Sequence, residues 1–120
     1  MPSTQKLYFT SSLSNEVSDH SPARNEQDVA LNTPVIIHFA EPVYKSSIDD
    51  FTFRVEDPSG RPYEGVFTLS DDQKELRFDR VVANYPAGWD ADAWITVKLR
   101  YLRDTRGDYM GSYSYKFHTR

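Results

Sequence analysis

Apolar and polar residues alternate in a series of short stretches along the chain. Successive side chains of a β-strand point to opposite faces, so alternation predicts a strand with one buried face. The pattern is strictest over residues 51–56, where Phe51, Phe53 and Val55 are expected to point into a core. The predicted strands cover residues 35–39, 51–56, 66–69, 76–78, 95–101 and 113–118.

Turn-forming residues separate these stretches. Asp57-Pro58-Ser59-Gly60 has proline second and glycine fourth, as type I turns favour, and predicts that strand 66–69 returns beside strand 51–56. A longer polar and aromatic loop is expected at 82–92. No stretch repeats apolar residues at helical spacing over three turns. The sequence therefore predicts an all-β fold, an antiparallel β-sandwich of about seven strands in two facing sheets.

One domain is expected, because 120 residues suit a single hydrophobic core. The beginning of the chain is rich in Ser, Asn, Asp and Glu and carries one β-like run, Leu7-Tyr8-Phe9-Thr10. We therefore predict a flexible segment over residues 1–20, with a candidate edge strand at this run, followed by the sandwich domain over residues 21–120.

Charge and composition argue against several classes of function. The net charge is −4 and the basic residues form no run, so no nucleic-acid partner is expected. No apolar stretch approaches the ~18 residues of a membrane-spanning helix, so no membrane insertion is expected. The N-terminus lacks the pattern of a signal peptide, which leaves an intracellular protein or a segment of a longer exported one. The chain has no cysteine, which excludes disulfides, a thiolate nucleophile and cysteine-based zinc sites.

Three stretches resemble a known family. They are Ser21-Pro22-Ala23 with the run Asp-Val-Ala-Leu-Asn-Thr-Pro-Val-Ile-Ile-His-Phe-Ala-Glu-Pro-Val over 28–43, the loop Asp104-Thr105-Arg106-Gly107-Asp108, and the closing stretch over 112–119. In order and spacing, the chain from Ser21 to Thr119 resembles the bacterial Ig-like domains that are repeated in S-layer proteins and adhesins. The resemblance implies that the sandwich is Ig-like.

The resemblance also implies a function. We expect a non-enzymatic module that serves in adhesion or as a structural spacer of a surface or secreted protein. Its partners would be neighbouring Ig-like domains of the same chain, or a surface protein or carbohydrate ligand. Its location would be extracellular or on the cell surface, within a longer exported protein, with the cytoplasm as the alternative. Some members of the family bind calcium, which makes calcium the candidate cofactor.

Two features depart from the family pattern. Pro86-Ala87-Gly88 is extended by residues 89–93, and some 20 residues precede the repeat. The chain also resembles periplasmic copper-binding sandwich proteins, which share a Ser-Pro-Ala opening and bind copper through an N-terminal and a late histidine. Here His20 is not terminal, and Asp108-Tyr109 stand where the late histidine is expected. A metal-binding sandwich, for calcium or copper, is therefore an alternative function.

Asp104 and Asp108 are the candidate metal ligands. Calcium prefers oxygen ligands, and two carboxylates four residues apart in a turn could join backbone carbonyls around such an ion. The alternative is that these aspartates cap the turn by accepting hydrogen bonds from nearby amides, which we favour. The same turn contains Arg106-Gly107-Asp108, a tripeptide that integrins recognise on exposed turns, although chance explains its presence more readily.

A second candidate site is a binding surface around the aromatic loop. Alternation that buries Ile95 places Trp94 on the outer face with Lys98 and Arg100. Together with Trp89 and Tyr85 of the adjacent loop, Trp94 could form a stacking platform for a sugar ring or a protein side chain. In that case the chain is a stand-alone carbohydrate- or protein-binding domain. The alternative, which we favour, is that the loop or the N-terminal segment covers Trp94 and closes one edge of the core.

No catalytic residues are predicted. The serines lack a nucleophile-elbow context, and no pair of carboxylates is marked as buried. His38 and His118 fall on outward-facing positions of separate strands. The chain is therefore not expected to be an enzyme.

Overall fold

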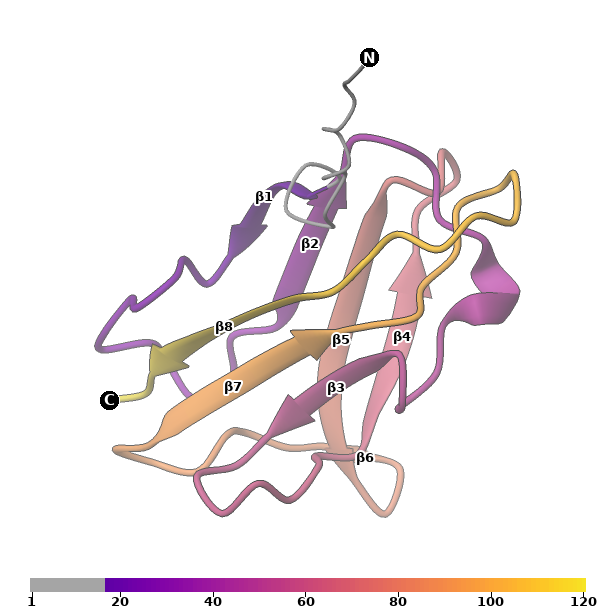
Figure 1. Ribbon diagram of the computed structural model, residues 1–120. Helices are drawn as coiled ribbons and strands as arrows, with labels where there is room; N and C mark the ends of the chain where they lie inside the picture. The colour runs from indigo at the N-terminus through magenta and orange to yellow at the C-terminus, as the bar shows by residue number, and fades with distance from the viewer. Residues whose placement is uncertain (1–16) are drawn as a thin grey trace.

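The computed structural model describes residues 17–120, and within them two antiparallel sheets face each other (Figure 1). One sheet has the order β1-β2-β5-β4, with the short β6 paired to β5, and the other has the order β3-β7-β8. The strands are β1 (Val17–Ser21), β2 (Val35–Phe39), β3 (Phe53–Glu56), β4 (Gly65–Leu69), β5 (Glu75–Val82), β6 (Tyr85–Pro86), β7 (Trp94–Leu99) and β8 (Tyr113–His118). The predicted all-β, Ig-like sandwich is confirmed.

Alternation buries one face of each central strand, as predicted. Val35, Ile37 and Phe39 of β2 point into the core, and Ile95 and Val97 of β7 meet them from the other sheet. Burying such aliphatic and aromatic side chains is the main stabilising contribution to a domain of this size. The only helical segment in the described part of the chain is a single 3₁₀ turn, η2 (Lys45–Ser47), and no helix there is long and apolar enough to cross a membrane.

The predicted inward position of Phe51 is wrong. Strand β3 begins two residues later, at Phe53, and the Phe51 side chain is 50% exposed. The cause is local, because the Asp49 carboxylate accepts hydrogen bonds from the backbone N–H groups of Phe51 and Thr52. These bonds hold residues 49–52 in a turn, as short polar side chains often do. Alternation therefore starts only after the turn.

The predicted pairing of strand 66–69 with strand 51–56 is also wrong. Strand β4 pairs with β5 in the opposite sheet, with Phe67 beside Phe78. The chain crosses between the sheets over residues 57–64, where Tyr63 still donates its N–H to Val55 of β3 at 2.7 Å. A turn signal defines a reversal of the chain, but it does not define whether the next strand stays in the same sheet.

The sandwich begins before the predicted boundary at residue 21. Strand β1 pairs with β2, with His20 beside Ile37. The β-like run at residues 7–10 lies outside the described residues, so the edge strand expected there stays a prediction. Past β1, the chain continues alongside β8, and Val29 forms a parallel bridge with Thr119. Residues 25–29 and the last residues of the domain therefore lie side by side.

Candidate functional site

The two candidate metal ligands occupy the turn between β7 and β8, and Asp104 is buried there. Its carboxylate accepts hydrogen bonds from the backbone N–H groups of Arg106 (2.9 Å) and Asp108 (3.1 Å), and from the Arg106 guanidinium at 2.8 Å. The hydrogen bond from the Arg106 guanidinium contributes most to lowering the pKa of Asp104, and the two amides contribute less. Together they keep this pKa below its usual value despite burial. Its neighbours are thus hydrogen-bond donors, which is the arrangement of a capped turn.

Asp108 is exposed, and its carboxylate lies 4.0 Å from the Arg106 guanidinium. Within the Arg106-Gly107-Asp108 tripeptide, the Arg106 guanidinium therefore contacts Asp104 and lies near the carboxylate of Asp108. Across residues 17–120, no group of three or more histidine and acidic side chains is arranged to hold a metal ion.

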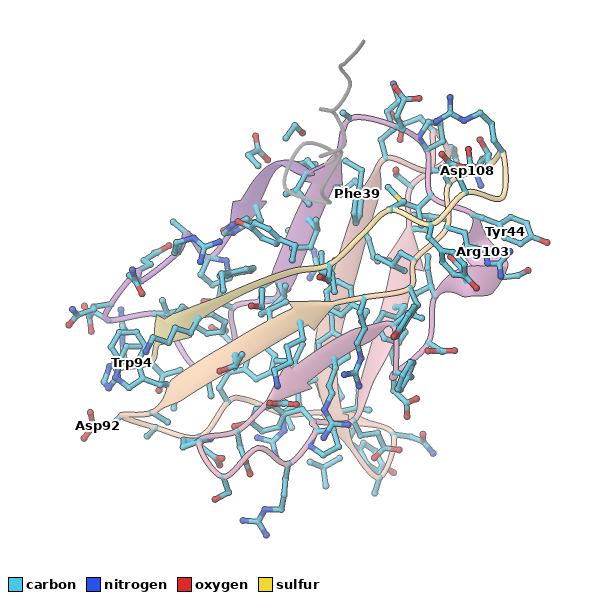
Figure 2. All side chains as sticks on the ribbon, in the orientation of Figure 1. Phe39, Tyr44, Asp92, Trp94, Arg103 and Asp108 are labelled. Carbon is cyan, nitrogen blue, oxygen red and sulfur yellow. The ribbon has the colours of Figure 1, made fainter. Side chains whose placement is uncertain are left out.

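Trp94 lies at the end of the molecule opposite to Asp108 (Figure 2). Its ring is 37% exposed and makes an edge contact with His118, with 4.9 Å between ring centroids. The Lys116 ammonium lies 4.8 Å from the centroid of the same indole. His118 is also 3.4 Å from the carboxylate of Asp92. The predicted outward orientation of Trp94 agrees with the structure, although neighbours on β8 cover part of the ring.

Trp89, the second tryptophan of the predicted platform, lies in the core and is only 4% exposed. Its indole N–H donates to the carbonyl of Thr33 at 2.8 Å, and its ring stacks on Phe78 and meets Phe117 edge-on. It cannot offer a face to a ligand, so its predicted role is wrong. The reason is that the Trp89 side chain, at the start of the extension 89–93, packs into the core, whereas residues 90–92 stay exposed.

The remaining platform residues are not gathered around Trp94. Tyr85 is 75% exposed on β6, which belongs to the opposite sheet from β7. Lys98 pairs with Glu56 at 3.1 Å. Burial opposes ionisation of Glu56, but the Arg54 and Lys98 contacts outweigh it and lower its pKa. Arg100 lies beyond the far end of β7, about 20 Å along the strand from Trp94 at ~3.3 Å per residue.

A surface that the alternation did not predict lies at the Arg100 end of β7. Three aromatic side chains are exposed there: Phe51 (50%), Tyr101 (58%) and Tyr109 (62%). The Phe51 and Tyr101 rings are nearly parallel, with centroids 5.7 Å apart, and Tyr109 meets Tyr101 edge-on at 6.1 Å. With Arg100 and Arg103 these residues form what we call the aromatic–arginine patch. Phe51, Arg100, Tyr101 and Tyr109, together with Gly111 and Ser112, line a depression of about 520 Å³.

Both arginines of the patch are held against its rings. The Arg100 guanidinium lies 4.2 Å from the centroid of Phe51, and its Nε–H donates to the Phe51 carbonyl. The Arg103 guanidinium lies 4.3 Å from the centroid of Tyr109 and donates to its hydroxyl at 2.6 Å. Stacking on a ring is favourable for a planar guanidinium and fixes its orientation.

Tyr101 has an unusual backbone conformation, with φ of +60°. A bulky residue rarely adopts this left-handed region, which costs roughly 1 kcal/mol or more. The bend ends the alternation at Leu99 and places the Tyr101 side chain outside the core, between Phe51 and Tyr109. In the sequence, the density of arginine and tyrosine between Arg100 and Tyr109 is the signal that could have indicated this surface.

Two histidine clusters connect neighbouring strands. The His38 ring bonds to the Asp19 carboxylate of β1 on one side and to the Glu75 carboxylate of β5 at 2.8 Å on the other. Both bonds raise the pKa of His38, and the bond with Asp19 contributes most. His20 lies between the two sheets, stacks on Tyr115 and bonds the Tyr113 hydroxyl at 2.8 Å. Each histidine thus has partners of its own.

Comparison with known families identifies the chain. The family described as "Bacterial Ig-like domain" matches residues 14–119, which is most of the sequence. The chain belongs to this family. No curated protein sequence matches this Ig-like domain significantly.

Solved structures share the fold of the domain. CopC from Methylosinus trichosporium OB3b superposes with a TM-score of 0.65 at 19% identity, covering 87% of this chain and 91% of CopC. PcoC, a copper resistance protein from Escherichia coli, superposes with a TM-score of 0.64 at 14% identity. The match covers 88% of this chain and 99% of PcoC. Domains 1–6 of the surface layer protein SbsC superpose with a TM-score of 0.60 at 13% identity. The match covers 85% of this chain but only 13% of the SbsC chain. At these identities the likeness establishes the fold alone.

Proposed function

We propose that this Ig-like domain is a non-enzymatic spacer module of an exported or cell-surface protein. The observation that carries the proposal is the contact between the segment after β1 and the last residues of the domain. Four backbone hydrogen bonds join residues 25–29 to residues 116–120. They run from Asn25 to Lys116 (2.7 Å), from His118 to Glu26 (2.8 Å), from Val29 to His118 (3.1 Å) and from Arg120 to Val29 (3.1 Å).

This terminal clamp, residues 25–29 with 116–120, suits a domain under tension. The two segments are parallel, as the bridge between Val29 and Thr119 shows. A pull on the chain before β1 and after Arg120 is carried first by the pairing of β1 with β2, and beyond it slides residues 25–29 past residues 116–120 along their length. Hydrogen bonds between the segments lie across this direction and are loaded together, whereas a sideways pull would open them one at a time. A domain strung between neighbours in a surface protein is pulled in the first way.

The ionisable groups with lowered pKa values support a non-enzymatic role. Perturbed carboxylates can mark catalytic sites, but turns and ion pairs perturb them too. Asp49, Asp57 and Asp72 have lowered pKa values because each accepts hydrogen bonds from amides or hydroxyls of its own turn. Local structure accounts for these shifts without a substrate.

Copper binding is the alternative that the likeness to CopC and PcoC raises. Imidazole is a good copper ligand, and the described chain holds three histidines. His20 bonds Tyr113 and the Pro22 carbonyl, His38 bonds two carboxylates, and His118 lies beside Trp94 and Asp92. These separate partners favour the spacer role over a shared copper site.

The spacer proposal is tested in the organism that makes the protein. An antibody raised against the domain is used on cell fractions and on intact cells treated with a protease. We expect the domain outside the cytoplasm, within a polypeptide longer than 120 residues. Detection only as a free cytoplasmic protein of 13.9 kDa would contradict the proposal.

A further inference from the structure

We propose that the aromatic–arginine patch is a binding site for an acidic polysaccharide, one whose sugar rings carry carboxylate groups. This goes beyond the spacer role and does not depend on it. Phe51, Arg100, Tyr101 and Tyr109 of the site line the depression of about 520 Å³, a volume within the usual range of ligand pockets, and Arg103 lies against Tyr109.

The three exposed rings do not pack into the hydrophobic core, so burial does not explain where they lie. Phe51, Tyr101 and Tyr109 are all absent from the buried cluster between the sheets. Their centroids follow one another at 5.7 and 6.1 Å, which gives a continuous aromatic surface. Contiguous exposed apolar surface of this kind marks interaction sites. The left-handed backbone of Tyr101 turns its ring out of the core and into this surface.

The two arginines give the patch a charge opposite to that of the protein. The chain carries a net charge of −4, yet no acidic residue lines the depression. Within residues 17–120, the ion pairs formed by arginines involve Arg54, Arg61, Arg77, Arg106 and Arg120, and neither Arg100 nor Arg103. Both guanidinium groups are oriented by the rings beneath them and retain N–H donors for a ligand. A carboxylate is the planar partner that such a fork of donors binds best.

An acidic sugar chain fits this surface better than an acidic peptide does. One face of a sugar ring is apolar and stacks on aromatic side chains, while its carboxylate reaches an arginine at the ring edge. A peptide would gain affinity by pairing its backbone with a free strand edge or by laying a helix in a groove. The patch is built from the turn before β3 and the loop between β7 and β8, and it offers side chains only.

The test uses the full chain and two matched probes, tetragalacturonate and its fully methyl-esterified form. The ester keeps the sugar rings but removes the charge. We expect saturable binding of the acid by calorimetry, with amide shifts at Phe51 and over residues 100–111 in NMR spectra. Binding of the ester should be at least about tenfold weaker, because it lacks the partner of the arginines. Equal binding of both probes, or no binding of the acid at millimolar concentration, would overturn the proposal.

Variants locate the site. Tyr109→Ala and Arg100→Gln should each weaken tetragalacturonate binding by about tenfold or more, as residues central to an interface do. Tyr109→Phe keeps the ring and should retain most of the affinity. Tyr85→Ala and Arg61→Gln change exposed residues outside the patch and should leave affinity within about twofold of the wild type.

Four of the five variants alter exposed side chains and Arg100→Gln alters a half-buried one, and a thermal melt of each establishes that it is folded. Equal weakening by Tyr85→Ala would place the binding site elsewhere and contradict the proposal. Hexaglutamate serves as the acidic peptide probe. If it binds more tightly than tetragalacturonate, and Tyr109→Ala abolishes that binding, the ligand of the patch is an acidic protein segment and the proposed ligand class is wrong. The spacer role is decided separately, by the location of the protein in its cells.

Discussion

Tyr113 and Tyr115 of β8 differ in whether the hydroxyl has a hydrogen-bond partner. The same substitution, tyrosine to phenylalanine, should therefore change stability in opposite directions at the two positions. Tyr115 is 3% exposed, and its hydroxyl is the one buried side-chain polar atom in residues 17–120 that lacks a hydrogen-bond partner. Burial raises its pKa above the ordinary value, as expected for a hydroxyl out of reach of water. Tyr113 instead bonds His20 through its hydroxyl at 2.8 Å.

The magnitudes follow from these environments. A buried hydroxyl without a partner costs about 1–3 kcal/mol in proteins, so Tyr115→Phe should increase the free energy of unfolding by about 1 kcal/mol. The ring would keep its stacking on His20, which has a centroid distance of 3.7 Å. Tyr113→Phe removes a satisfied hydrogen bond and should decrease the free energy of unfolding by about 0.5–1.5 kcal/mol.

Urea unfolding, followed by tryptophan fluorescence, measures both variants on one scale. For a domain of this length, 1 kcal/mol corresponds to roughly 4 °C in melting temperature, which a thermal melt resolves. Most substitutions destabilise, so a stabilising change at Tyr115 is a demanding expectation. Destabilisation by Tyr115→Phe would mean that its hydroxyl is bonded in the native state, and would refute the described packing of β8 against β1.

Two further predictions concern the core and the sheet surface. In Gly65→Ala, the new Cβ would lie 2.2 Å from the Phe78 ring and 2.7 Å from the Asp79 carbonyl, so we expect a loss of about 2–3 kcal/mol in urea unfolding. Gly60→Ala, with nothing within 4 Å, should lose only about 1 kcal/mol, from its left-handed backbone, and equal losses would contradict the close contact. The raised pKa of His38 means that its contacts stabilise the fold fully below its unfolded pKa of about 6.5 and are lost as pH rises through the higher folded value. The stability difference between wild type and His38→Gln should therefore shrink as pH rises, and a constant difference would exclude this titration.

Period-two alternation predicted the strands well, because burial of one sheet face is recorded directly in the sequence. Residues 35–39 and 113–118 form β2 and β8 with the predicted bounds. The alternation failed where a side chain or backbone bend overrides it. Phe51 belongs by pattern to β3, but the Asp49 carboxylate holds it in a turn. Which sheet β4 joins depends on contacts between distant residues, and a local turn signal cannot report them.

The candidate site was harder to predict than the fold, because exposure depends on where loops pack. Trp89 lies in a polar loop by sequence, and only the folded chain brings it over Phe78 and the Thr33 carbonyl. In the sequence, Tyr101 continues the alternation of β7, but its left-handed backbone takes it out of the strand. The aromatic–arginine patch exists because of the backbone bend at Tyr101 and the turn at Asp49. Its residues were visible in the sequence, but their proximity was not.

The spacer role is tested most directly by mechanical unfolding of single molecules. The chain has no cysteine, so introduced cysteines provide unique attachment points. One variant is pulled through its two ends, which shears the terminal clamp. A second, Arg24→Cys/Ser114→Cys, is pulled through these two exposed positions, which peels the clamp open sideways. Forced unfolding is governed by the unfolding rate, so the loading rate is kept equal. We predict a clearly higher unfolding force through the ends than through the side positions. Equal forces in the two geometries would contradict a clamp that bears tension and, with it, the spacer role.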